Sequence, residues 1–117
     1  MTVSKMAFVM YPVTDMARAI AFYRDTLGLQ PDGLALDYWA EFNIDGATFG
    51  VGNFEQVGKP GTAQSLAIEV TDMEATRAEL KEKGVETNEV FETPICFISG
   101  LKDPDGNSVL LHQAKVQ

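Results

Sequence analysis

The sequence predicts an α+β domain made of two βαβββ repeats, and two pairs of similar segments within the chain lead to this prediction. Val13-Thr14-Asp15-Met16 recurs 57 positions later as Val70-Thr71-Asp72-Met73. The stretch Ile44–Phe49 (IDGATF) resembles Pro104–Val109 (PDGNSV), 60 positions later. Because two echoes at similar offsets are hard to obtain by chance, we infer half-chain repeats at about residues 1–57 and 62–117. At 117 residues, a single domain over residues 1–117 is the default.

One helix is predicted in each repeat, directly after a capping aspartate. The carboxylates of Asp15 and Asp72 can accept hydrogen bonds from the free amides of a first helical turn. Gly28 and Gly84 follow where a helix needs a left-handed residue at its end. The first helix carries a clear apolar stripe, at Met16, Ile20, Tyr23 and Leu27, which assigns Tyr23 to the core. The second stripe is weaker, with only Met73 and Leu80 clearly on it.

Strands are predicted on both sides of each helix. In the first repeat they are expected at Lys5–Val13 and at about 34–36, 38–44 and 47–53. In the second they are expected at Gln64–Val70 and at about 86–91, 95–101 and 107–113. Asp45-Gly46 and Asp103-Pro104-Asp105-Gly106 are the predicted hairpin turns, and residues 54–64 are the linker. We interpret Asp103 and Asp105 as turn formers that bond the local backbone, not as a catalytic pair.

Composition narrows the classes of function. The 9 Lys and Arg residues against 17 Asp and Glu residues leave a net charge of −8, which argues against nucleic acid or an anionic membrane as partner. Cys96 is the only cysteine, so an intrachain disulfide, a thiolate zinc site and a CxxC motif are excluded, and we expect it to be a small buried side chain. No apolar run is long enough to cross a membrane, and the N-terminus does not look like a signal peptide, so we expect a cytoplasmic protein.

Four segments together resemble the vicinal oxygen chelate superfamily, which includes glyoxalase I, extradiol dioxygenases, and bleomycin- and fosfomycin-resistance proteins. These segments are VTDM at 13–16, IAFYRDTLGL at 20–29, LAIEVTD at 66–72 and DPDGN at 103–107. The resemblance covers essentially the whole chain. It implies strands that curl around an open cavity, and it implies a homodimer.

Metal-using members of that superfamily bind a divalent ion with His, Glu or Gln from four strands. The resemblance maps two of these positions seven residues before each capping aspartate, onto Phe8 and Ser65. It maps the other two onto Leu110, seven residues after Asp103, and onto Gly50 through the repeat. Three of these four residues offer no ligand atom, and a lone Ser hydroxyl is a poor donor. We therefore expect the family's metal site to be absent and no cofactor to be bound.

Alternation along the strands then predicts the side chains that line the cavity. Met10 follows Phe8 on the same face, and Trp39 and Glu41 share one face of their strand. The predicted ligand-binding residues are Phe8, Met10, Trp39, Glu41, Gly50, Ser65 and Leu110. Trp39 can either stack on a planar ligand or pack in the core.

The same alternation adds two candidate catalytic residues, Glu69 and His112. His112 is the only histidine, and so the natural acid or base near neutral pH, although it can equally be an idle residue near a strand end. Glu69 lies between Ile68 and Val70, where desolvation would raise its pKa, or it can be a solvated side chain at the cavity mouth. A displaced metal site would need Glu41, Glu69 and His112 together.

Three classes of function follow from these residues. The first is metal-independent binding of a small, largely apolar ligand, with a cationic ligand favoured by an acidic rim. The second is a glyoxalase-like lyase, isomerase or dioxygenase that uses the displaced metal or acid–base chemistry by Glu69 and His112. The third is a structural or partner-binding module whose cavity is closed by its own side chains.

Overall fold

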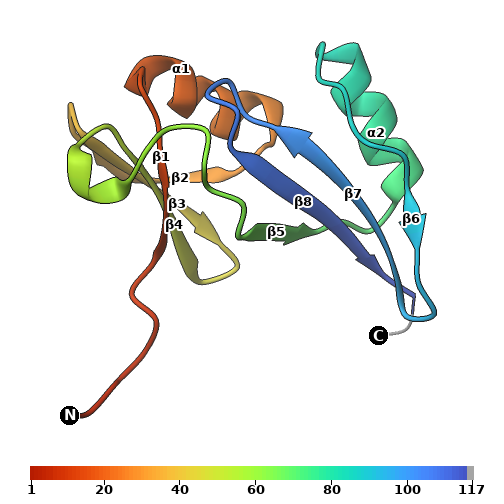
Figure 1. Ribbon diagram of the computed structural model, residues 1–117, viewed down its shortest axis with the longest axis horizontal. Coiled ribbons are helices and arrows are strands. Elements are labelled where there is room, and N and C mark those ends of the chain that lie inside the picture. Colours follow the sequence, from red (N-terminus) through yellow and green to blue (C-terminus); the bar gives the residue numbers. More distant parts are fainter. Residues whose placement is uncertain (116–117) are drawn as a thin grey trace.

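The computed structural model describes residues 1–115 and has two four-stranded sheets and two α-helices (Figure 1). The first half contains β1 (Val9–Pro12), α1 (Met16–Ala21), the π-helical η1 (Phe22–Thr26), β2 (Gln30–Ala35), β3 (Trp39–Ile44) and β4 (Ala47–Gly52). After the 3₁₀ helix η2 (Glu55–Val57), the second half contains β5 (Leu66–Glu69), α2 (Met73–Glu82), β6 (Phe91–Glu92), β7 (Cys96–Lys102) and β8 (Ser108–Ala114). This order is βαβββ twice, so the predicted fold class is confirmed.

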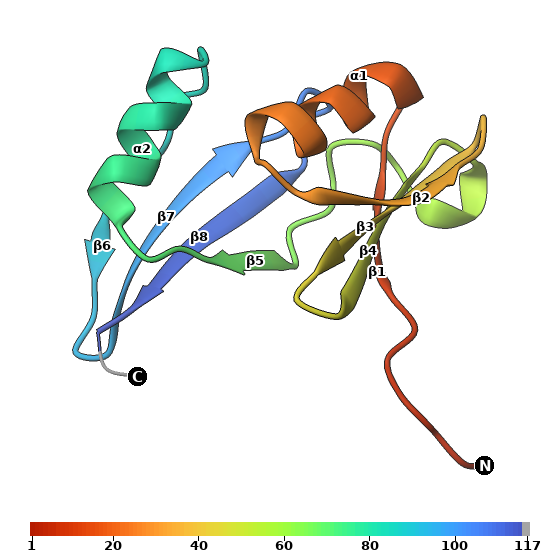
Figure 2. The same ribbon diagram turned by 180° about the vertical axis from the view of Figure 1, so that it is seen from behind.

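The two sheets have the same topology. The strand orders are β1-β4-β3-β2 and β5-β8-β7-β6, and in each sheet the first strand runs parallel to the last while the other pairs are antiparallel. The sheets lie next to each other at an angle, with both helices toward one side, and they do not close into a barrel (Figures 1 and 2). Within residues 1–115, no helix has the length and hydropathy needed to cross a membrane.

Both helices begin and end as the sequence predicts. The side chain of Asp15 accepts a hydrogen bond from the Arg18 amide, and that of Asp72 accepts one from the Ala75 amide. Gly28 and Gly84 have φ of 73° and 83°, which is the left-handed region that glycine enters without a steric cost. The π-helical turn after α1 was not predicted, because apolar spacing does not separate it from an α-helical turn.

Three predicted strands differ by more than two residues from the observed ones. The first strand begins at Val9, not Lys5, because its pairing with β4 starts there and the N-terminal segment before it leads away from the sheet (Figure 1). The second strand starts early, at Gln30, because an exposed edge strand tolerates Pro31 and Gly33, and the register shifts there. Of the predicted 86–91 strand only Phe91 lies in a strand, β6 (Phe91–Glu92), although the Asn88 amide also bonds the Gly100 carbonyl.

The core is mainly aromatic in the first half, and one tyrosine ties the two halves together. Tyr23, Phe42 and Phe49 are almost completely buried, with ring centroids 4.9 to 6.3 Å apart, which confirms Tyr23 as a core residue. The Tyr11 hydroxyl donates to the Ser108 carbonyl at 2.6 Å and accepts from the Leu66 amide at 2.7 Å. Burial raises the pKa of this hydroxyl, so it remains a protonated bridge between the sheets. Cys96 is buried, as predicted.

Candidate functional site

The inner face of each sheet, opposite the buried core, carries most of the residues predicted for the cavity. On the first sheet this face is filled by Trp39. A Cβ atom at Gly50 would lie 2.3 Å from the indole, and one at Gly52 would lie 3.0 Å from it, so the ring occupies the space above two glycines. The Phe8 ring packs on the indole edge to face, at 5.1 Å between centroids. Trp39 is therefore only 9% exposed, whereas Phe8 is 43% exposed.

Glu41 lies beside Trp39 on the same inner face, as the alternation predicted. The indole Nε1 donates a hydrogen bond to Glu41 Oε2 at 2.8 Å, and this bond fixes the two side chains relative to each other. Both Glu41 and Met10 are in register with Gly50, one from each neighbouring strand. The indole is packed against its own sheet, so the arrangement of Trp39 favours packing over a free stacking surface.

On the inner face of the second sheet, Glu69 and His112 form a pair across two parallel strands. They are register partners, and His112 Nδ1 lies 2.6 Å from Glu69 Oε1. The other Glu69 oxygen accepts a hydrogen bond from the Ala114 amide at 2.8 Å. An ionised Glu69 that accepts from Nδ1–H leaves Nε2 as the free ring nitrogen. The pair therefore has the arrangement of a histidine base that is oriented by a carboxylate, and both side chains are partly exposed.

Of the two alternatives for Glu69, the structure supports the solvated side chain, and the rise in pKa expected in an apolar cavity does not occur. The Ala114 amide and then His112 hold the pKa of this carboxyl below its ordinary value. Hydrogen bonds to the charged form outweigh desolvation here, because the carboxylate is on an open face and not in an apolar cavity. Glu69 is therefore ionised at neutral pH, which suits an orienting partner for His112 better than a general base.

A hollow of about 850 Å³ opens at the end of the second sheet near its hairpin turn. We call it the second-sheet hollow; it is lined by Phe22, Gln64 and the segments 84–88, 100–104 and 108–110. Of the predicted ligand-binding residues, Leu110 is in this lining. The sequence prediction missed segment 84–88 because the walls of the hollow depend on where that irregular segment packs, which no local pattern encodes.

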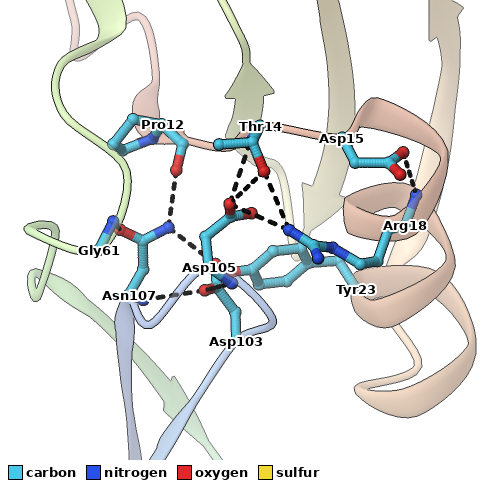
Figure 3. A network of polar contacts seen from close by, with 9 residues as sticks. All are labelled: Pro12, Thr14, Asp15, Arg18, Tyr23, Gly61, Asp103, Asp105 and Asn107. Atoms are coloured by element: carbon cyan, nitrogen blue, oxygen red, sulfur yellow. Dashed lines mark hydrogen bonds and ion pairs between the residues drawn. The ribbon is translucent and has the colours of Figure 1, made fainter.

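The turn next to the hollow is held by a buried polar network (Figure 3). The Asp103 carboxylate accepts hydrogen bonds from the Tyr23 hydroxyl at 2.7 Å, from the side-chain and backbone nitrogens of Asn107 and from the Asp105 amide, each at 2.9 Å. Burial and the nearby Asp103 raise the pKa of the Tyr23 hydroxyl, so this hydroxyl stays protonated and donates the hydrogen bond to Asp103. The backbone bonds confirm Asp103 as a turn former.

The same network reaches into the first half of the chain. Asp105 Oδ1 accepts from Thr14 Oγ1 at 2.7 Å and from the Arg18 guanidinium at 3.1 Å (Figure 3). Asn107 Nδ2 donates to the Pro12 carbonyl at 2.7 Å. The sequence did not predict these contacts, because the partners are about 90 residues apart along the chain.

The four positions that the family uses for a metal do not fit one in this chain. Phe8 and Leu110 have hydrocarbon side chains, and Gly50 has none. Only Ser65 has a polar side chain, and the other three positions add no carboxylate or imidazole ligand to its hydroxyl. In residues 1–115 no three His, Cys, Asp or Glu side chains are grouped so that they could hold a metal ion. Glu41 bonds Trp39 on the first sheet, and Glu69 and His112 pair on the second, so the displaced set does not assemble.

Comparisons with known proteins agree with this architecture. The model of the Glyoxalase/Bleomycin resistance protein/Dioxygenase superfamily matches residues 5–111. The chain is similar to TnmS3, an antibiotic binding protein from Streptomyces sp. CB03234, with 28% identity and a TM-score of 0.83 over 98% of this chain and 99% of that one. A glyoxalase/bleomycin resistance protein from the same Streptomyces is 28% identical, with a TM-score of 0.77 over 89% of this chain and 96% of that one.

A third solved structure shows the fold alone. Lactoylglutathione lyase from Agrobacterium tumefaciens is 16% identical, with a TM-score of 0.80 over 95% of this chain and 94% of that one. No curated protein matches the sequence significantly. With the repeated βαβββ topology and a family match over most of its length, this chain belongs to the Glyoxalase/Bleomycin resistance protein/Dioxygenase superfamily.

Proposed function

We propose that this protein binds a small, largely apolar molecule in the second-sheet hollow and needs no metal to do so. The observation that carries the proposal is the similarity to the antibiotic binding protein TnmS3 over essentially the whole of both chains. The hollow has the volume typical of small-molecule sites, and Phe22, Val85 and Leu110 contribute apolar lining. The residues at the family's metal positions support binding without a metal, because they supply no set of ligands.

The test is a thermal-shift screen with antibiotics of positive, neutral and negative charge, followed by calorimetry on those that stabilise the protein. A ligand that binds the folded state alone raises the melting temperature, and the shift grows with the logarithm of the ligand concentration above Kd. We expect saturable 1:1 binding that is unchanged after the protein is treated with a chelator. Stoichiometric metal in the purified protein at neutral pH, or binding that disappears on chelation, would contradict the metal-independent proposal.

A second candidate function is acid–base catalysis by His112 with Glu69, and their 2.6 Å contact favours it. In this scheme Glu69 accepts from Nδ1–H, and Nε2 takes a proton from a C–H or O–H acid on the substrate. Replacing His112 with Gln would then abolish turnover of a glyoxalase- or isomerase-type substrate, and Glu69→Gln would lower it, with folding unchanged in both. Full activity in His112→Gln would exclude this function.

The proposed setting is the one expected from the sequence, a cytoplasmic homodimer. Phe8, Met10, Ala67 and Leu110 leave apolar surface accessible on the inner faces of the single chain, and such surface is often covered in an oligomer. Sedimentation equilibrium of the wild type and of Met10→Glu tests this proposal. We expect a dimer that the charged variant weakens, whereas a wild-type monomer at all concentrations would contradict it.

A further inference from the structure

The second-sheet hollow has hydrogen-bond donors that are free to meet a ligand. Lys102 Nζ lies 2.7 Å from the Ser108 hydroxyl, and both residues line the hollow. An ammonium group has three N–H donors, so two remain after this bond. Within residues 1–115 Lys102 forms no ion pair, and the side-chain amides of Gln64 and Asn88, also in the lining, have no hydrogen-bond partner.

Two acidic residues, Asp103 and Glu86, also line the hollow. Asp103 is buried, and its two oxygens already accept four hydrogen bonds. Glu86 is in the lining and, like Lys102, is exposed, so solvent screens both charges, but only Lys102 is held at the hollow by another lining residue, Ser108. Neither Glu41 nor Glu69 is part of this lining.

The glycine in the wall explains how one of the free amides reaches this position. Gly100 is in register with Leu110, and a Cβ at Gly100 would lie 2.9 Å from Asn88 Nδ2. The missing side chain leaves room for the Asn88 amide above Gly100. The lining therefore includes both apolar side chains and nitrogen donors.

We propose that the ligand of this hollow carries an anionic oxygen group, such as a carboxylate, which binds the Lys102 ammonium. This inference rests on the proposed function, since it assigns the polar end of the same ligand. The Lys102 ammonium has only donors and matches an anionic oxygen, and an amine would face it as a like charge; the amides of Gln64 and Asn88 can donate to the same oxygen but can also accept from other groups. The net charge of −8 favours cations at long range, but salt screens charges more than about 8–10 Å away, so the groups in the lining decide.

The experiment compares three probes with the same ring: 1-naphthylacetate, 1-naphthylacetamide and 2-(1-naphthyl)ethylamine, which are anionic, neutral and cationic. Binding is measured by calorimetry, and amide chemical shifts locate each probe. We expect naphthylacetate to bind most tightly, with shifts at 84–88 and 100–102. Lys102→Met keeps the length of the side chain without its charge and should weaken naphthylacetate about tenfold while leaving the neutral amide unchanged. Lys59→Met is the matched control and should change the affinity for neither probe.

The outcomes separate the two proposals. If all three probes bind equally at the hollow and Lys102→Met has no effect, the anion proposal is overturned while binding in the hollow stands. If the amine binds most tightly and Glu86→Gln weakens it, the ligand is cationic and the anion proposal is again overturned. If none of the probes binds up to its solubility limit, or the shifts lie elsewhere, both proposals fail.

Discussion

The inner faces of the two sheets have the same topology but opposite distributions of side-chain volume. On the first sheet, Trp39 lies over the glycines of β4 and fills the face. On the second sheet the register pair is Gly100 with Leu110, so the glycine is on β7 and the larger side chain on β8. One face is therefore closed by the chain itself, while the other borders the hollow. The comparison teaches that two halves with the same topology can place their glycines, and so the space on their inner faces, differently.

The hairpin turns of the two halves also differ, in burial and in the number of hydrogen bonds that they make. In the first half Asn43 Oδ1 accepts one hydrogen bond, from the Gly46 amide at 2.8 Å, and the turn is exposed. In the second half Asp103 is buried and accepts from Tyr23, Asn107 and Asp105. A local turn closes its own hairpin, whereas the buried one also connects the two halves through hydrogen bonds.

The largest expected effect comes from breaking the buried turn. Asp103→Ala leaves the Tyr23 hydroxyl and the Asn107 amide without their acceptor, and we expect the free energy of unfolding to fall by roughly 3–5 kcal/mol. Asn43→Ala, its counterpart in the first half, should cost less than about 1 kcal/mol because water replaces the lost bond. Urea unfolding of both variants measures the difference, and equal losses would show that the two turns are equivalent.

The next largest change in the free energy of unfolding is expected from adding a methyl group at Gly50, compared with the same change at Gly100. Gly50→Ala places a Cβ 2.3 Å from the rigid indole, so we expect a loss of about 2–3 kcal/mol and a changed emission from Trp39, the only tryptophan. Gly100→Ala meets the end of the flexible Asn88 side chain at 2.9 Å and should change stability by less than about 1 kcal/mol. Denaturant unfolding followed by fluorescence tests both, and the comparison fails if Gly50→Ala is as stable as Gly100→Ala.

A smaller effect is expected at the edge of the filled face. Phe8→Ala removes the edge-to-face contact with Trp39, so we expect a loss of about 1 kcal/mol and a red-shifted emission as water reaches the indole. Met6→Ala is the control, because Met6 is 69% exposed and should change neither quantity. An unshifted emission maximum in Phe8→Ala would mean that Phe8 does not shield the indole.

The smallest effect is a pH dependence at the Glu69–His112 pair. Because the folded-state pKa of Glu69 is below its ordinary value of 4.5, its contribution to stability is complete above that value and is lost as the pH falls through the folded-state pKa. Melting temperatures of the wild type and Glu69→Gln should therefore converge in acid.

The carboxyl ¹³C titration of Glu69 provides the direct measurement. The Ala114 amide is the main cause of the shift, so in His112→Ala the pKa of Glu69 should rise only in part and stay below its ordinary value. A complete return to the ordinary value would assign the shift to His112 instead.

Much of the architecture could be predicted from local chemistry in the sequence. The capping aspartates, the glycines after each helix and the Asp45-Gly46 turn specify their own backbone geometry, and the internal echoes specify the repeat. Alternation also predicted the shared face of Trp39 and Glu41, because the side chains of any strand alternate. The sequence alone was also sufficient to show that Phe8, Gly50, Ser65 and Leu110 are not a metal-binding set, since this depends only on which ligand atoms exist.

Only the tertiary structure decided what depends on distance through space. The sequence left the direction of the Glu69 pKa shift open, because that shift depends on Ala114 and His112, which lie on another strand. The position of Trp39 over Gly50 requires the register of β3 with β4, and the walls of the hollow require the packing of segment 84–88 against β7. Local sequence specifies backbone shape, but burial, solvation and the space left for a ligand arise between segments that are distant in the chain.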